Sequence, residues 1–235
     1  MELTKQHWKK EDIQPFLAYL KSFSKGEEKA LWEQRIVNTK MPCLAVASTK
    51  IDEITKQIFK GNYIEYLSLW IFENLSCTFI ISKLISKIKD FKTFKFYLEK
   101  FSEQVDNWAS CDTIKFNIKN NEQQFFDLST DFVKSEKVFK RRIGVRILFK
   151  FLDDENILKV FDIIKTLKNE QEYYVNMAIS WLMCDAFIKC REQTLKFLKS
   201  NSLNEFCLNK MISKCQDSFR ISKEDKLMLK SFKAH

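Results

Sequence analysis

The sequence predicts an all-α protein made of amphipathic helices joined by short polar segments. The chain has 235 residues and 45% of them are hydrophobic, so it can bury a sizeable core. It contains only 3 Gly and 2 Pro, far below ordinary usage of roughly 7% and 5%. All-β folds need frequent turn residues and nucleotide-binding loops need glycines, so both classes are disfavoured.

Apolar residues recur at helical spacing along the chain, and polar breaks separate the runs. The first three predicted helices are residues 13–23, residues 27–38 before Pro42, and a run that Ser48 or Thr49 caps and Gly61 ends. Residues 63–89 read as two helices that meet near residues 74–76. The next helix is predicted at 91–105, and Asp106 is the predicted N-cap of a helix that continues through Asp112. Further helices are predicted at 122–135, 137–152, 157–168, 173–190, 192–200, 203–219 and 223–232.

Short joints between amphipathic helices indicate antiparallel helix pairs. A Trp or an Arg pair recurs at a repeat-like interval, because 34 residues separate Trp108 from Arg142 and 39 separate Arg142 from Trp181. This interval suits two-helix repeats of the HEAT or armadillo size. No linker rich in Gly, Pro or Ser divides the chain. We therefore expect one domain over residues 1–235, folded as a right-handed all-α solenoid of antiparallel helix pairs.

The net charge is +9 and the isoelectric point is near 9.1. An excess of Lys and Arg raises the chance of a polyanionic partner, either nucleic acid or an anionic membrane. A proteome biased toward Lys explains the same excess without any such partner. The most apolar stretch, residues 67–84, contains Glu73 and Lys83, so no transmembrane helix and no membrane partner are expected.

Cysteine and histidine usage argues against a metal site. The seven cysteines form no CxxC motif, and His7 and His235, the two histidines, lie near the ends of the chain. Zinc sites need closely spaced Cys and His ligands, so neither a metal nor a cofactor is expected. An odd number of thiols and an N-terminus without an apolar signal core favour reduced, mostly buried cysteines and a cytoplasmic location, in a bacterial cytosol or nucleoid.

Trp108 and Asp112 are four residues apart on a predicted helix, so the indole and the carboxylate lie on one face. Side by side, they can line a site that stabilises positive charge. A buried Trp above a surface Asp explains the same pattern. Trp181 has the small neighbours Ala178 and Ser180, but its helix is apolar over most of its circumference, which by composition alone makes Trp181 a core residue.

The helix at 137–152 carries an apolar stripe and a basic stripe. The basic stripe is Arg142, Arg146 and Lys150, each four residues after the last. Their mutual repulsion, a few tenths of a kcal/mol per pair, would be relieved by a bound phosphate backbone. The alternative is that these residues form a solvent-exposed face whose charge is neutralised by carboxylates of a neighbouring helix. Gly144 within this helix indicates either a close approach by another helix or ligand, or slack packing.

Five segments together resemble one family. They are MPCLAV (41–46), WASCD (108–112), KRRIGV (140–145), YVNMAISW (174–181) and SFRISKED (218–225). In this order and spacing the chain resembles the HEAT-like repeat DNA alkylation repair glycosylases, the AlkD family, from about residue 13 to 230. The resemblance implies removal of cationic N3- and N7-alkylated purines from duplex DNA, without the base entering a pocket.

By motif, the family's Trp, Asp, Arg and second Trp fall on Trp108, Asp112, Arg142 and Trp181. The resemblance implies that Asp112 stabilises the charge that develops on the deoxyribose, that the two indoles hold the sugar, and that Arg142 holds a phosphate. Further DNA contacts are expected at Arg141, Arg146, Lys150, Arg220 and Lys223. The expected partner is duplex DNA with alkylated bases, bound by a monomer.

The second predicted helix departs from the family pattern, which is more basic or aromatic at this point. It carries three carboxylates, Glu27, Glu28 and Glu33. An acidic helix facing phosphates would weaken the capture of DNA. The alternatives are therefore a relative with weak or no excision activity that binds another nucleic acid or a protein, and a helical-repeat scaffold in which the Trp residues are core.

Overall fold

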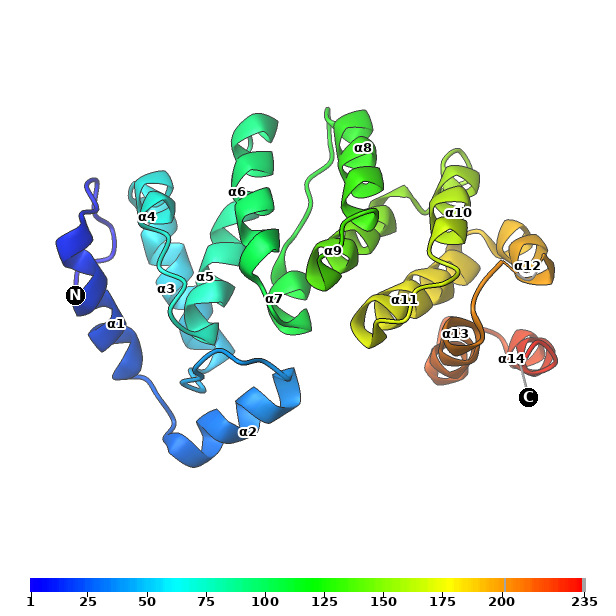
Figure 1. The fold of residues 1–235 in the computed structure, drawn as a ribbon, viewed down its shortest axis with the longest axis horizontal. Coiled ribbons are helices and arrows are strands. Elements are labelled where there is room, and N and C mark those ends of the chain that lie inside the picture. The colour runs from blue at the N-terminus through cyan, green and yellow to red at the C-terminus, as the bar shows by residue number, and fades with distance from the viewer. Residues whose placement is uncertain (201, 234–235) are drawn as a thin grey trace. The chain divides into compact units, whose positions relative to one another are not determined.

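The computed structural model describes residues 1–200 and 202–233, and over these residues all of its regular secondary structure is helical (Figure 1). The described residues form fourteen α-helices and two short 3₁₀-helices, with no strand among them. The predicted all-α class is confirmed. Every predicted helix is present, and the observed ends differ from the predicted ones by a few residues.

Contacts divide the chain into two compact units that meet between Asn117 and Ile118. The first unit contains α1 (Ile13–Lys21), α2 (Glu27–Val37), α3 (Ser48–Lys60), α4 (Tyr63–Leu69), α5 (Leu75–Ile85), α6 (Phe91–Gln104) and α7 (Trp108–Thr113). The second contains α8 (Glu122–Val133), α9 (Val138–Leu148), α10 (Ile157–Thr166), α11 (Tyr173–Lys189), α12 (Arg191–Lys199), α13 (Glu205–Asp217) and α14 (Lys223–Lys230).

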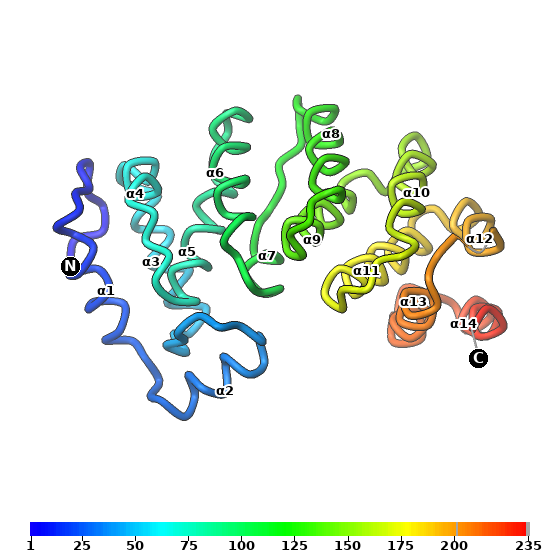
Figure 2. The backbone as a smooth tube through the Cα atoms, in the orientation of Figure 1, coloured from blue at the N-terminus to red at the C-terminus, as the bar shows by residue number. Residues whose placement is uncertain are grey.

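Alternate helices stack within each unit, as in helical repeats. In the first unit α3 packs on α5 and α5 packs on α7, and in the second α9 packs on α11 and α11 on α13 (Figure 2). The predicted antiparallel helix pairing is clearest at α8 and α9, which pack closely. The right hand of the solenoid and the single domain remain predictions.

Several helices are capped at their N-terminus by the side chain of the preceding residue. Asn62, Asn74, Asp90 and Asn204 each accept a hydrogen bond from the backbone N–H three residues later, at 2.8–3.2 Å. Such caps satisfy one of the backbone donors that a helix N-terminus leaves unpaired. These short polar residues are the joints between the apolar runs of the sequence.

The start of the first unit is held by an aromatic cluster. Trp8, Phe16 and Tyr66 are almost fully buried. The ring centroid of Tyr66 lies 5.0 Å from that of Trp8 and 5.3 Å from that of Phe16, both edge to face. Rings in this geometry add about 0.5–1.5 kcal/mol to the effect of burial, so the cluster fixes α1 on α4.

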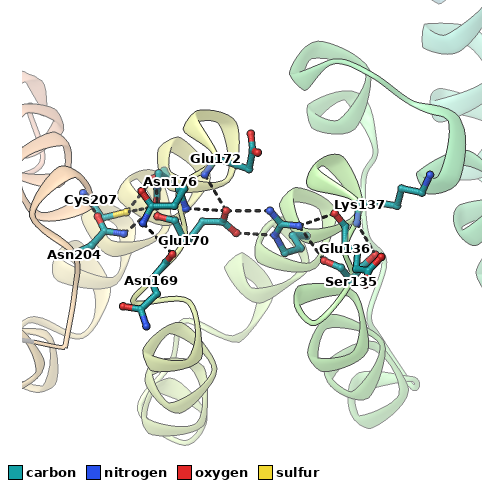
Figure 3. Close-up of polar contacts among 11 residues, drawn as sticks. Ser135, Glu136, Lys137, Asn169, Glu170, Glu172, Asn176, Asn204 and Cys207 are labelled. Atoms are coloured by element: carbon teal, nitrogen blue, oxygen red, sulfur yellow. Dashed lines mark hydrogen bonds and ion pairs between the residues drawn. The ribbon is translucent and has the colours of Figure 1, made fainter.

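A network of polar contacts connects α9, α11 and α13 in the second unit (Figure 3). The Arg141 guanidinium donates to both oxygens of Glu170, at 2.6 and 3.0 Å, and to the carbonyl of Ser135 at 3.0 Å. The amide of Asn176 donates to the Glu170 carbonyl at 3.0 Å, and Asn204 donates to Asn176 at 3.0 Å. These bonds connect the α8–α9 corner to α11 and α13.

Gly144 lies where α9 meets α8, so a helix and not slack packing explains this residue. A Cβ placed on Gly144 would lie 2.9 Å from the backbone nitrogen of Val133 and 3.0 Å from the Cβ of Phe132. We expect Gly144→Ala to lower the free energy of unfolding, because overpacking of about 1–3 kcal/mol exceeds the helix-propensity gain of about 1 kcal/mol. Urea denaturation measures the change, and a more stable variant would contradict the close packing.

Candidate active site

α7 begins at Trp108, and Asn107 caps it. The Asn107 side chain is buried and accepts a hydrogen bond from the Ser110 N–H at 2.8 Å. The prediction that Asp106 is the N-cap is therefore wrong by one residue. Asp106 instead accepts bonds from the Thr39 hydroxyl at 2.6 Å and the Lys40 N–H at 2.7 Å. It thereby fastens the start of α7 to the segment that follows α2.

The two faces of α7 differ in burial. Ser110 and Cys111 are fully buried, and the Ser110 hydroxyl bonds to the Thr78 hydroxyl of α5 at 2.7 Å. Trp108 and Asp112 are both half-buried. The indole and the carboxylate therefore lie at the surface of the first unit, one helical turn apart, as their spacing predicts.

Trp181 is not a core residue, although most of α11 is buried. Its side chain is 38% exposed, whereas its neighbours Ser180 and Leu182 are completely buried. The Lys214 ammonium lies 4.3 Å from the centroid of the Trp181 ring. Burial lowers the pKa of Lys214. Composition alone favoured a core position for Trp181, and that expectation is wrong.

The exposed face of Trp181 lines a cleft of about 310 Å³ within the second unit. The other lining residues come from the 3₁₀-helix Phe149–Phe151, from α11 and α13, and from the turn after α13: Phe149, Cys184, Asp185, Lys214, Asp217, Ser218 and Arg220. The Arg220 guanidinium donates to the Asp185 carboxylate at 2.8 Å. Lys214 and Asp185 are not among the site residues predicted from the sequence. The signal that was present is that Asp185 follows Trp181 at the spacing of Asp112 and Trp108.

Arg142 is buried, with 3% of its surface exposed, and donates a hydrogen bond to the Tyr174 carbonyl. It thus joins α9 to the first turn of the helix that carries Trp181. The predicted basic stripe of Arg142, Arg146 and Lys150 along one helix does not form, because Arg142 is buried against α11 and α9 ends at Leu148. The Arg146 guanidinium lies 4.9 Å from the centroid of the Phe149 ring.

The five predicted DNA contacts differ in exposure. Lys150, Arg220 and Lys223 are exposed, and Arg146 is half-buried. Lys150 lines a small cleft together with Glu122 and Asp153. Arg141 holds Glu170 and two backbone carbonyls, so the structure gives it an internal role in place of the predicted DNA contact.

The carboxylates of α2 do not all face solvent. Glu27 and Glu28 are exposed, but Glu33 accepts a hydrogen bond from the Ala45 N–H at 2.9 Å, and burial raises its pKa. The expected row of three surface carboxylates is therefore reduced to two. The only buried residue of α2 is Val37, and the large apolar side chains of this helix are exposed: Leu31, Trp32 and Ile36.

A protein-family model described as "DNA alkylation repair enzyme" matches residues 10–213. The chain belongs to the DNA alkylation repair enzyme family. The match extends from the turn before α1 into α13, so it includes Trp108, Asp112, Arg142 and Trp181. The family predicted from the five sequence segments is confirmed. No curated protein matches the chain.

Among residues 1–200 and 202–233, no helix is both long enough and apolar enough to span a bilayer. In the same residues, His, Cys, Asp and Glu side chains form no group of three or more placed to hold a metal ion. All seven cysteines are free thiols, and all but Cys43 are buried.

Proposed function

We propose that this DNA alkylation repair family member is a glycosylase that releases cationic N3- and N7-alkylated purines from duplex DNA. The observation that carries the proposal is the pairing of Trp108 with Asp112 at the surface of α7, within the region that matches the family. The reaction is hydrolysis of the N-glycosidic bond. Water forms a C–O bond to the deoxyribose carbon and releases one proton to solvent, and the cationic base leaves as a neutral molecule with the electron pair of the broken C–N bond.

The chemistry suits a carboxylate next to an aromatic ring. An alkylated purine already carries positive charge, so its departure needs little protonation. Positive charge then develops on the deoxyribose, as in the oxocarbenium-like states of glycoside hydrolysis. The Asp112 carboxylate would stabilise that charge and orient the attacking water. The π face of Trp108 would favour the same charge.

The second unit offers a further set of proposed DNA contacts. The exposed ring of Trp181 would hold the sugar, beside Lys214 and Arg220 of the same cleft. Arg142 is buried between α9 and α11, so we assign it as a positioning residue for the Trp181 helix in place of the phosphate contact that the resemblance implies. Arg146, Lys150, Arg220 and Lys223 remain the proposed contacts to the DNA backbone.

The test is release of free base under single-turnover conditions. The purified chain is mixed in excess with duplex DNA that contains one 7-methylguanine, and free base is quantified against time. The same duplex with unmodified guanine is the control. Release from the methylated duplex alone supports the proposal. Failure to exceed spontaneous depurination at high enzyme concentration would contradict it.

A second candidate function is a family member that binds nucleic acid or protein with weak or no excision. The exposed Glu27 and Glu28 favour it, because carboxylates at a DNA-facing helix oppose phosphate binding. The exposed apolar residues of α2 also suit a protein partner. Binding to the methylated duplex that falls with salt, without release of base, would favour this candidate over the glycosylase.

A further inference from the structure

A cleft of about 460 Å³ lies in the first unit between α3, α5 and the segment after α7. It is separate from the cleft at Trp181. Its lining residues are Asp52, Thr55, Lys56, Phe59, Lys83, Ser86, Lys87, Thr113 and Lys115. Thr113 is the last residue of α7, so the cleft reaches the end of the helix that carries the proposed catalytic carboxylate.

The cleft has an excess of positive charge. Four lysines line it against one carboxylate, which leaves a formal charge of +3. The Lys83 ammonium pairs with Asp52 at 2.7 Å, and the Lys87 ammonium lies 5.4 Å from the centroid of the Phe59 ring. Among the described residues no carboxylate lies within ion-pair distance of Lys56 or Lys115. These two ammonium groups are available to an anion.

The polar walls of the cleft are already internally bonded, so charge is what the cleft offers to a ligand. The Thr55 and Thr113 hydroxyls donate to backbone carbonyls within their own helices, at 2.7 and 2.9 Å. The Ser86 hydroxyl accepts the Lys115 N–H at 2.9 Å. That last bond holds the Lys115 segment against α5 and thereby positions its ammonium group at the cleft.

The charge of α2 makes a basic cleft in this unit more significant. α2 carries three Glu against Lys29 and Arg35, a formal charge of −1. Cations that hold a polyanion on the first unit must therefore come from other elements. The lysines of α3, α5 and the segment after α7 supply them, and they adjoin the helix of Trp108 and Asp112.

We propose that this lysine cleft, defined by Lys56, Lys83, Lys87 and Lys115, binds backbone phosphates of the DNA strand that passes Asp112. The proposal rests on the proposed glycosylase function. In this proposal the first unit binds duplex DNA through charge and does not recognise the base sequence. A double substitution at the two unpaired lysines tests it.

The experiment measures the affinity of the full chain for methylated duplex DNA across a series of salt concentrations. For Lys56→Gln/Lys115→Gln we expect the slope of log affinity against log salt to become shallower by about 2, because each lost phosphate contact removes about 0.9. The matched control is Lys21→Gln/Lys92→Gln, two exposed lysines on α1 and α6, for which we expect the wild-type slope. Circular dichroism verifies the fold of each variant.

The outcomes separate this proposal from the glycosylase function. A wild-type slope in Lys56→Gln/Lys115→Gln overturns the lysine cleft, even if base release is intact. A reduced slope in a chain that binds DNA but releases no base supports the cleft and overturns the glycosylase alone. A free mononucleotide that binds the wild type and not the variant, with an unchanged DNA slope, also overturns the assignment to the DNA strand.

Discussion

Asp112→Asn is expected to lower the single-turnover rate of 7-methylguanine release by about 100- to 1,000-fold, the usual effect of removing one charge-stabilising group in an active site. The amide keeps the size of the carboxylate and loses its negative charge. Charge developing on the deoxyribose would then have no anionic partner at this position. Affinity for the duplex should change little, because the lost interaction belongs to the transition state.

The control is Asp131→Asn, because Asp131 is an exposed carboxylate on α8 outside both clefts. It should release base at the wild-type rate. Asp112 is half-buried at the surface of α7, so the substitution should leave the fold intact, which circular dichroism checks. Retention of most of the wild-type rate in Asp112→Asn would remove Asp112 from the catalytic role.

Arg141→Ala is expected to lower the free energy of unfolding by about 3 kcal/mol, because it leaves the Glu170 carboxylate buried without its cation. The side chains of Arg141 and Glu170 are only 15% and 6% exposed. Loss of the guanidinium also removes the bonds to the carbonyls of Ser135 and Glu136. Urea denaturation at pH 7 measures the change.

Arg191→Ala is the matched control for this stability prediction. Arg191 also forms a forked pair, with Asp225, but its side chain is 42% exposed. Solvent screens such a pair, so its removal should change the free energy of unfolding by about 0–1 kcal/mol. Equal losses in the two variants would show that burial of the Arg141–Glu170 pair contributes nothing extra.

The pH dependence of the Arg141 effect follows from the pKa of Glu170. Burial alone would raise that pKa, but the Arg141 guanidinium and the N–H groups of Glu172 and Gln171 together lower it below 4.5. A lowered folded-state pKa stabilises the fold above the unfolded value, and this contribution is lost as pH falls through the folded value. The difference between wild type and Arg141→Ala should therefore be full at pH 7 and shrink below about pH 4.5.

Helical elements could be predicted from the sequence because their signals are local. Apolar residues at helical spacing mark the buried faces, and the short polar residues Asn62, Asn74, Asp90 and Asn204 cap the helices that follow them. The N-cap predicted for α7, Asp106, is one residue before the observed one. Asp106 and Asn107 are equally good caps by type, and only the contact of Asp106 with Thr39, distant in sequence, decides between them.

Burial of the candidate site residues depends on tertiary packing and could not be predicted. Trp181 lies in a mostly apolar helix, but its indole reaches the surface because α13 leaves a cleft beside it. Arg142 is charged, but it is buried because the Tyr174 carbonyl of α11 accepts its hydrogen bond. Arg141 is next to it in sequence and bonds to Glu170, whose position no local pattern indicates.

The central claim is that Trp108 and Asp112 of α7 act on the same nucleotide. A double-mutant cycle of Trp108→Ala and Asp112→Asn, followed by single-turnover release of 7-methylguanine, tests it most directly. Trp108→Ala alone should lose about 2- to 30-fold in rate. The double variant should depart from the product of the two single losses by about 0.5–3 kcal/mol of coupling. Losses that multiply to within about 0.5 kcal/mol, or no loss in either variant, would contradict a site shared by the indole and the carboxylate.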